Sequence, residues 1–201
     1  LPAHLSALDR KQLVHPVPTA EDDEPFYRFN HILIRDAAYN GLLKRARAGL
    51  HERFVEWADA RNADADRGME FEEILGYHLE QAYRYRVELG PLHDDARSLA
   101  SRAGDHLETA GRRAYARGDV GAAVTLLERG MELLPPGRTG VDLGLTLAEA
   151  VFDSGRLEDA VARTLSVVER AAASGDAHGV LRARIEHARL ASSIDRSITV
   201  E

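Results

Sequence analysis

Gly118-Asp-Val-Gly-Ala-Ala-Val124 recurs in this chain as Gly155-Arg-Leu-Glu-Asp-Ala-Val161, at a spacing of 37 residues. In both copies a glycine interrupts one helical pattern, and a second pattern begins directly after it. A repeat of this length that holds two helices indicates a solenoid, because each helical hairpin needs a neighbour on which to bury its apolar face. The sequence therefore predicts an all-α array of helical hairpins.

The remainder of residues 70–201 is also helical in pattern. Apolar residues recur at the spacing of helix turns, and glycine, proline or Gly-Asp punctuation separates the segments. No alternating strand pattern competes with them. The predicted helices are Glu70–Leu89, Leu92–Arg117, Val120–Leu134, Val141–Ser154, Leu157–Ala173 and Asp176–Ser193. Whether the last of these starts a further repeat or caps the array stays open.

The strand signals all lie near the N-terminus. Phe26-Tyr-Arg-Phe29 alternates apolar and polar residues, as a short strand does. Before it we expect a short helix at His4–Gln12, an extended piece at Leu13–Val14 and a turn among prolines. Two helices follow the strand, the first with Asn30 as its expected N-cap. A strand–turn–strand ribbon beside helices is the winged-helix arrangement.

The chain is therefore expected to have three parts. Residues 1–60 form the end of a winged-helix domain, and residues 70–201 form the helical repeats. Residues 61–69 are the linker between them, because this stretch is polar and shows no periodicity. The first residue is Leu1 rather than Met, so we expect the chain to be a piece of a longer protein.

Composition narrows the class of protein. The 201 residues carry a formal net charge of −7, and residues 1–60 hold 8 basic and 9 acidic side chains. Nucleic-acid binding needs a clustered basic surface, which this balance disfavours. The absence of cysteine excludes disulfides and thiolate zinc sites. No apolar run reaches the ~18–20 residues of a membrane helix, and no signal pattern opens the chain, so we expect a cytoplasmic protein.

The motifs of common catalytic sites do not occur. The chain has neither a phosphate-binding Gly-x-x-x-x-Gly-Lys-Ser/Thr loop nor a Gly-x-Gly-x-x-Gly fingerprint. His51-Glu52 starts like a zinc-protease motif, but Val55 stands where the second histidine would be. We therefore expect no catalytic residue, no cofactor and no metal in this chain, which would make it a non-enzyme.

The first repeat unit is similar to a tetratricopeptide repeat (TPR). The matching apolar, small and proline positions are Leu107, Ala110, Gly111, Ala114, Ala123, Leu127 and Pro135. Gly111 and Ala123 take the small positions at which the two helices of the repeat press together. The second unit keeps small Ala148 and Ala160 but has Val167 where a small residue is usual. The implied fold is mainly all-α, a tetratricopeptide-like helical hairpin solenoid preceded by the remnant of a winged-helix domain with a short β-ribbon.

Two blocks, in this order, resemble one family of regulators. The first is Phe29-Asn-His31-Ile-Leu-Ile34-Arg35-Asp36-Ala-Ala38-Tyr39, and the second runs from Ala103-Gly-Asp-His-Leu107 to Leu133-Leu134-Pro135. The family is that of the signal-transduction NTPases with numerous domains (STAND ATPases). The most similar subgroup is bacterial and joins an ATPase module and helical repeats to an adenylate/guanylate cyclase or a LuxR-type DNA-binding domain. The resemblance implies that this chain is a non-catalytic, regulatory part of such a protein.

The resemblance also implies a nucleotide role for His31. In related NTPases the histidine at this place reaches the β-phosphate of bound ADP and helps to hold the inactive state. An imidazole N–H near a helix N-terminus suits an anion. ATP or ADP would bind only together with an upstream ATPase domain, because this chain has no phosphate loop. The alternative is that His31 caps or packs the start of its helix.

The repeats also predict a partner surface. Arrays of this kind bind on the concave surface lined by the first helix of each hairpin, where a protein partner or a signal ligand would be received. The residues that we expect there are Asp105, Glu108, Arg112, Tyr115, Glu149 and Phe152. The winged helix would relay the signal to the upstream nucleotide-binding core. Two alternatives stay open, a stand-alone tetratricopeptide adaptor and a DNA-binding regulator that uses its winged helix directly.

Overall fold

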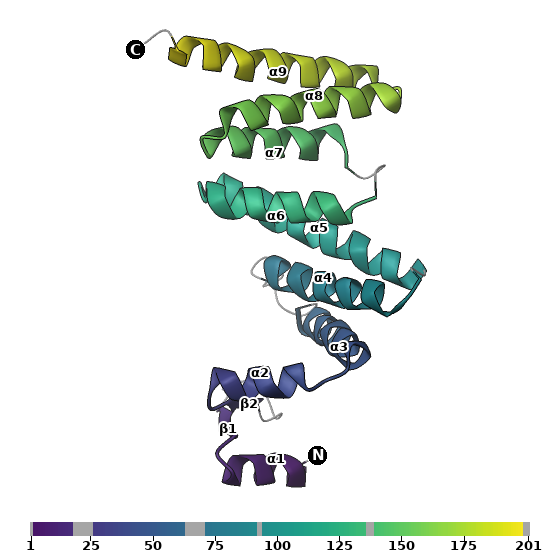
Figure 1. Cartoon of the computed structure of the whole chain (residues 1–201), viewed down its shortest axis with the longest axis vertical. Coiled ribbons are helices and arrows are strands. Elements are labelled where there is room, and N and C mark those ends of the chain that lie inside the picture. Colours follow the sequence, from purple (N-terminus) through teal and green to yellow (C-terminus); the bar gives the residue numbers. More distant parts are fainter. Residues whose placement is uncertain (1, 18–25, 63–70, 92–93, 136–138, 199–201) are drawn as a thin grey trace. The chain divides into compact units, whose positions relative to one another are not determined.

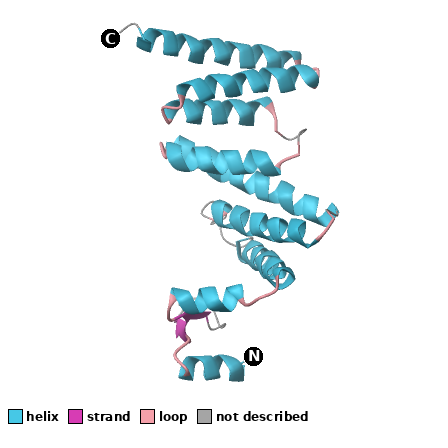
Figure 2. Cartoon of the chain, in the orientation of Figure 1, coloured by secondary structure: helices cyan, strands magenta, loops and turns pink. Residues whose placement is uncertain are grey.

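The computed structural model describes residues 2–17, 26–62, 71–91, 94–135 and 139–198. Over these residues the chain is helical except for one two-stranded ribbon (Figure 2). The chain divides into two compact units, Leu1–Arg47 and Ala48–Glu201.

The first unit combines short helices with the ribbon. Its elements are α1 (Pro2–Arg10), β1 (Val14–Val17), β2 (Phe26–Phe29) and α2 (Ile32–Asn40). The strands are antiparallel, with Val14 opposite Phe29 and Val17 opposite Phe26. The predicted strand at Phe26–Phe29 is confirmed, and the predicted extended piece continues to Val17. Pro16 is tolerated within β1 because a two-stranded ribbon consists of edge strands. The predicted proline-rich turn lies mostly at residues 18–25, outside the described residues.

Helix α2 is capped by His31 and not by Asn30. His31 has extended backbone angles (φ −146°, ψ 144°), and its Nδ1 accepts a hydrogen bond from the Leu33 N–H at 3.1 Å. The side chain of Asn30 instead donates to the carbonyl oxygen of Gln12 at 2.6 Å. The prediction of Asn30 as the N-cap is therefore wrong by one residue. Asn30 ties the start of α2 to the turn that follows α1.

The second unit is built from long helices in sequence order (Figure 1). They are α3 (Lys44–Asn62, of which the first turn belongs to the first unit), α4 (Glu72–Leu89), α5 (Asp94–Ala116), α6 (Val120–Leu133), α7 (Val141–Asp153), α8 (Leu157–Ala173) and α9 (Ala177–Ile198). The starts of the predicted helices from 70 onward agree within two residues. Helix α9 continues past the predicted end at Ser193.

The division between the units falls inside α3. The buried side chains of Val55 and Ala58 on α3 pack in one apolar cluster with Leu75 and Leu79 on α4. Most of α3 therefore belongs with the helices that follow it, although the sequence analysis expected a boundary at residue 60. Of the expected linker 61–69, the first two residues end α3 and the rest lies outside the described residues.

Three tight turns depend on glycine. Gly118 between α5 and α6, Gly155 between α7 and α8, and Gly175 between α8 and α9 have φ values of 81°, 88° and 75°. This left-handed conformation is strained for residues with a side chain, so glycine ends each helix without steric strain. Both copies of the repeated motif thus mark the turn within a helical hairpin, as their positions predicted.

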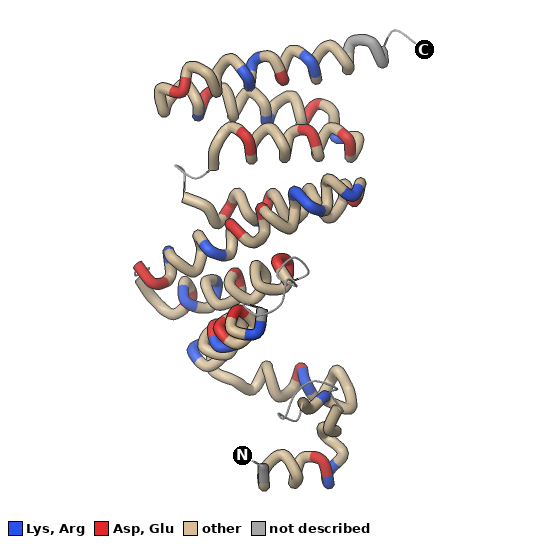
Figure 3. Tube along the Cα trace, turned by 180° about the vertical axis from the view of Figure 1, so that it is seen from behind, with Lys and Arg blue, Asp and Glu red and all other residues tan. Residues whose placement is uncertain are grey.

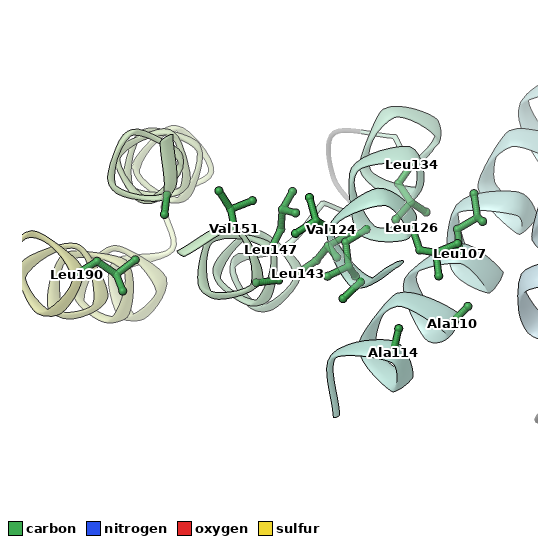
Figure 4. Packing of buried hydrophobic residues seen from close by; sticks show 14 residues of the cluster. Leu107, Ala110, Ala114, Val124, Leu126, Leu134, Leu143, Leu147, Val151 and Leu190 are labelled. Atoms are coloured by element: carbon green, nitrogen blue, oxygen red, sulfur yellow. The ribbon is translucent and has the colours of Figure 1, made fainter. Parts of the chain in front are cut away.

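The core of the repeats lies within each hairpin and between the two hairpins. A Cβ added to Gly111 on α5 would lie 2.7 Å from Cγ of Leu127 on α6, and Ala123 is completely buried. Figure 4 shows Val124 of α6 beside Leu143 and Leu147 of α7, so one apolar cluster spans both hairpins. The small residues of the repeat motif are thus at the close helix contacts, and the second unit is a tetratricopeptide-like helical hairpin solenoid. None of the described helices combines the length and apolar character that a membrane span requires.

Candidate functional site

The first helices of the two hairpins, α5 and α7, share a polar surface with α9, the helix that follows the second hairpin. Helix α7 contacts both α5 and α9, and the three helices line an open cleft of about 500 Å³ that we call the first-helix cleft. The residues that line it are Arg112, Asp142, Leu145, Thr146, Glu149, Arg182, Ile185 and Glu186. A cleft of this size is in the range of sites that bind small ligands or single side chains.

Helix α7, in the middle, contributes only acidic charge. Asp142, Thr146, Glu149 and Asp153 follow one another at intervals of three or four residues, so they share one helix face. Helix α7 contains no lysine or arginine. Figure 3 shows acidic segments along α7 and mainly basic ones along α9. The cations of the cleft therefore come from the neighbouring helices.

Arginines on α5 and α9, the two helices that contact α7, bind either to α7 or to an acidic residue of their own helix. Arg112 on α5 donates from Nη1 to Thr146 Oγ1 at 2.8 Å, and its Nε donates to Glu108 Oε1 at 2.8 Å. On the other side, Arg182 of α9 lies 2.7 Å from the carboxylate of Asp142. These contacts bridge α5 to α7 and α7 to α9, so the cleft has walls that are held in place.

Glu149 lies at the centre of this acidic face. Burial raises the pKa of its carboxyl, and the negative charges of Glu186 and Asp153 raise it further, against a lowering by Arg189. Arg189 is 3.9 Å away, and its Nε lies 2.9 Å and 3.0 Å from the two oxygens of Glu186. The guanidinium of Arg189 thus lies much closer to Glu186 than to Glu149.

Tyr115 contacts the last residue of the acidic face of α7. Its hydroxyl on α5 donates a hydrogen bond to Asp153 Oδ2 on α7 at 2.7 Å. Burial raises the pKa of this phenol, and the hydrogen bond to the negative Asp153 raises it further. Tyr115 therefore stays protonated, which suits a positioning contact rather than a base or a nucleophile.

The six residues predicted for the partner surface are brought together only in part. Arg112 and Glu149 line the cleft, Glu108 is bound to Arg112, and Tyr115 is bound to Asp153, which is not among the lining residues. Phe152 instead packs against the buried core, and Asp105 lies outside the cleft lining. All six are half-buried, although the sequence analysis expected them to be exposed.

Four residues of the cleft that the sequence analysis did not name have polar or charged side chains. They are Asp142, Thr146, Arg182 and Glu186. Asp142 and Thr146 could have been found from the regular acidic face of α7. Arg182 and Glu186 required the register of α9, which the sequence left open.

His31 and His51 lie elsewhere. His31 belongs to the first unit and caps α2 through Nδ1, which is the structural alternative given above. His51 is buried, and its Nδ1 lies 2.8 Å from Nδ1 of His78 on α4. In the part of the chain that the structure describes, no three histidine or carboxylate side chains are arranged to hold a metal ion.

Comparisons with known proteins give little beyond this geometry. No family model and no curated protein matches the chain. The solved structures similar to it include a Podospora anserina protein described as a kinesin light chain with nearly identical TPR-like repeats. The two are 18% identical, with 76% of this chain and 86% of that chain covered and a TM-score of 0.39. At this level of similarity, the fold assignment rests on the hairpins, glycine turns and small contact residues described above.

Proposed function

We propose that this chain is a non-catalytic regulatory and protein-interaction module, and that a partner binds in the first-helix cleft. The observation that carries the proposal is the cleft itself. Helices α5, α7 and α9 together place acidic and basic side chains in it. Charged groups held on rigid helices favour specific recognition, because their positions are set before the partner arrives.

The chemistry of the cleft favours binding over catalysis. Arg112 and Arg182 are held in contacts with polar or acidic groups, and Tyr115 is kept protonated. Groups arranged in this way stabilise one another and have no activated nucleophile among them. A protein segment or a signal ligand is therefore the expected occupant.

We further propose that the module belongs to a multidomain STAND-type ATPase with a cyclase or LuxR-type output. The support is the motif block around His31, followed in the right order by the repeat block. The first unit, with a two-stranded ribbon between short helices, is compatible with the end of a winged helix. Such a winged helix would relay binding at the repeats to an ATP- or ADP-bound core upstream.

Site-specific photo-crosslinking in the native host tests the interaction role. A photoreactive residue replaces Thr146 in the cleft or, as the matched control, Glu169, which is exposed on α8. We expect a discrete protein adduct from position 146 and none from position 169. Equal labelling from both positions, or no adduct from position 146, would contradict the proposed site.

The size of the native polypeptide tests the proposed parent protein. An immunoblot with an antibody against this chain is expected to show a band several times larger than 22.1 kDa. A band near 22 kDa would instead support the stand-alone adaptor and remove the basis for a nucleotide role of His31.

A further inference from the structure

The central carboxylate of the first-helix cleft lacks a close cation. Among the described residues, Glu149 pairs with Arg189, whose Nη2 lies 3.9 Å from Oε1. Ion pairs elsewhere in the cleft are much closer, such as Arg182 with Asp142 at 2.7 Å. A carboxylate among other carboxylates is unfavourable unless a cation approaches it.

The arginines already present cannot easily supply that cation. Arg112 is engaged by Glu108 and Thr146, and Arg189 is engaged by both oxygens of Glu186. Around the cleft, three arginines face five carboxylates, so its formal charge is −2. The arginines counted are Arg112, Arg182 and Arg189, and the carboxylates are Glu108, Asp142, Glu149, Asp153 and Glu186. An excess of negative charge at a concave site attracts a cation from outside.

The same cleft offers an apolar contact. Ile185 on α9 lines it and is 61% exposed, so its side chain is accessible to a partner. Lysine and arginine have aliphatic stems that pack on apolar surface while the charged end reaches a polar group. Ile185 for the stem and Glu149 for the charged end together match such a side chain.

We propose that the first-helix cleft binds a lysine or arginine side chain of an extended partner segment, with Glu149 as its principal acceptor and Ile185 as the contact for its stem. This inference rests on the proposed interaction function and names the chemistry of the partner. The neighbouring carboxylates of Glu186 and Asp153 add long-range attraction, while the arginines bound to Thr146 and Asp142 hold α5, α7 and α9 in register.

NMR titration of the ¹⁵N-labelled 201-residue chain tests the inference. The probe is a short acetylated peptide with one arginine between glycine and serine residues, and its control carries citrulline, the neutral isostere. We expect the arginine peptide to shift the amide signals of Thr146, Glu149 and Ile185. We expect the citrulline peptide to bind about threefold to fivefold more weakly, a difference that shrinks in about 0.5 M NaCl.

Variants separate the site from general charge effects. Glu149→Gln should weaken the arginine peptide about threefold to fivefold, and Glu169→Gln on the exposed face of α8 should leave its affinity unchanged. Equal binding of the arginine and citrulline peptides, or equal weakening by the two variants, would overturn the inference. If Thr146 crosslinks a partner whose capture is insensitive to Glu149→Gln, the inference fails and the proposed function stands. If no adduct forms at position 146, the proposed function itself fails.

Discussion

Val167 on α8 occupies the space that Gly144 leaves open on α7. A Cβ on Gly144 would lie 2.6 Å from Cγ2 of Val167, and Val167 itself is 2% exposed. The equivalent residues 37 positions earlier are Leu107 and Gly130, where the large residue is on the first helix and the glycine on the second. In both hairpins one residue of the pair is glycine, which lets the two helices approach closely at this level. Gly144 thus explains how Val167 can stand where a small residue is usual.

The contact predicts that substitutions at Gly144 and Val167 have strongly coupled effects on the free energy of unfolding. Gly144→Ala should destabilise the second unit by about 1–3 kcal/mol, because the new methyl group overlaps Val167. Combined with Val167→Ala, its cost should be smaller by about 1 kcal/mol or more. Urea unfolding of the two single variants and the double variant measures this coupling. Strict additivity would mean that the two residues do not share one packing space.

Ala123→Arg tests the close contact of the first hairpin. Ala123 is completely buried between α5 and α6, so a long charged side chain there should cost about 4 kcal/mol or more. For a protein of this size the melting temperature should fall by roughly 10 °C. Ala162→Arg on the exposed face of α8 is the matched control and should melt within a few degrees of the unchanged chain. Similar melting of both variants would show that the repeat register is wrong.

Glu80 is a buried charge on α4 that joins this helix to α6. Its carboxylate is 2% exposed and accepts hydrogen bonds from Arg129 Nε on α6 at 3.1 Å and from Arg84 Nη2 on its own helix at 2.7 Å. Burial alone would raise the pKa of Glu80, but these two arginines outweigh it and lower that pKa below 4.5. The ionised carboxylate therefore stabilises the fold above pH 4.5, and this contribution is lost as the pH falls through the lowered pKa.

The corresponding variant is Glu80→Gln. At neutral pH it should lower the free energy of unfolding by about 1–3 kcal/mol, because the two arginines lose their charged partner. It should also flatten the loss of stability at acidic pH. Denaturant unfolding at several pH values measures both effects, with Glu169→Gln as the exposed control. An unchanged free energy of unfolding at neutral pH would contradict the role given to Glu80.

The His51–His78 pair predicts a second pH dependence at milder acidity. The two Nδ1 atoms are 2.8 Å apart, so one must carry the hydrogen that the other accepts, and protonating both would set two N–H groups against each other. Burial, together with the charge of His51, lowers the pKa of His78 to about 4. In the unfolded chain His78 titrates near 6.5, so stability is highest above pH 6.5 and falls as the pH drops from 6.5 to about 4.

His78→Phe separates this effect from that of Glu80. The ring of His78 stacks on Phe54 with centroids 4.0 Å apart, so phenylalanine keeps the ring contact and removes the titration. Between pH 7 and pH 5 the unchanged chain should lose part of a total of up to about 3 kcal/mol, while the variant should change much less. Parallel stability curves for the two proteins over this range would rule out His78 as the source.

His31 allows the capping and nucleotide roles to be told apart. In the full-length native polypeptide, His31→Ala removes both the cap and the imidazole, whereas His31→Asn keeps a good N-cap. If the imidazole contacts ADP, both variants should release ADP faster than the unchanged protein. If only His31→Ala accelerates release, the effect comes from about 1 kcal/mol of lost capping. Release rates of a fluorescent ADP analogue distinguish these outcomes.

The helices and their turns could be predicted from the sequence because local interactions decide them. The glycines at 118 and 155 end helices through a backbone conformation that other residues avoid, and this preference acts within one turn. The small residues Gly111 and Ala123 are similarly diagnostic, since only a small residue fits a close helix contact. The choice between Asn30 and His31 as N-cap was not predictable, because both side chains can accept a helix N–H, and the contact of Asn30 with the Gln12 carbonyl decides between them.

The sequence by itself thus determined that this protein is an array of helical hairpins with small residues at defined contacts. The cleft was decided only by the tertiary structure. Arg112 meets Thr146, and Tyr115 meets Asp153, across 34 and 38 residues and between different hairpins. Such distances depend on how one hairpin is rotated against the next, which is set by the summed packing of many side chains and not by local preference. For the same reason Phe152, which the sequence placed on the partner surface, turned out to pack against the core.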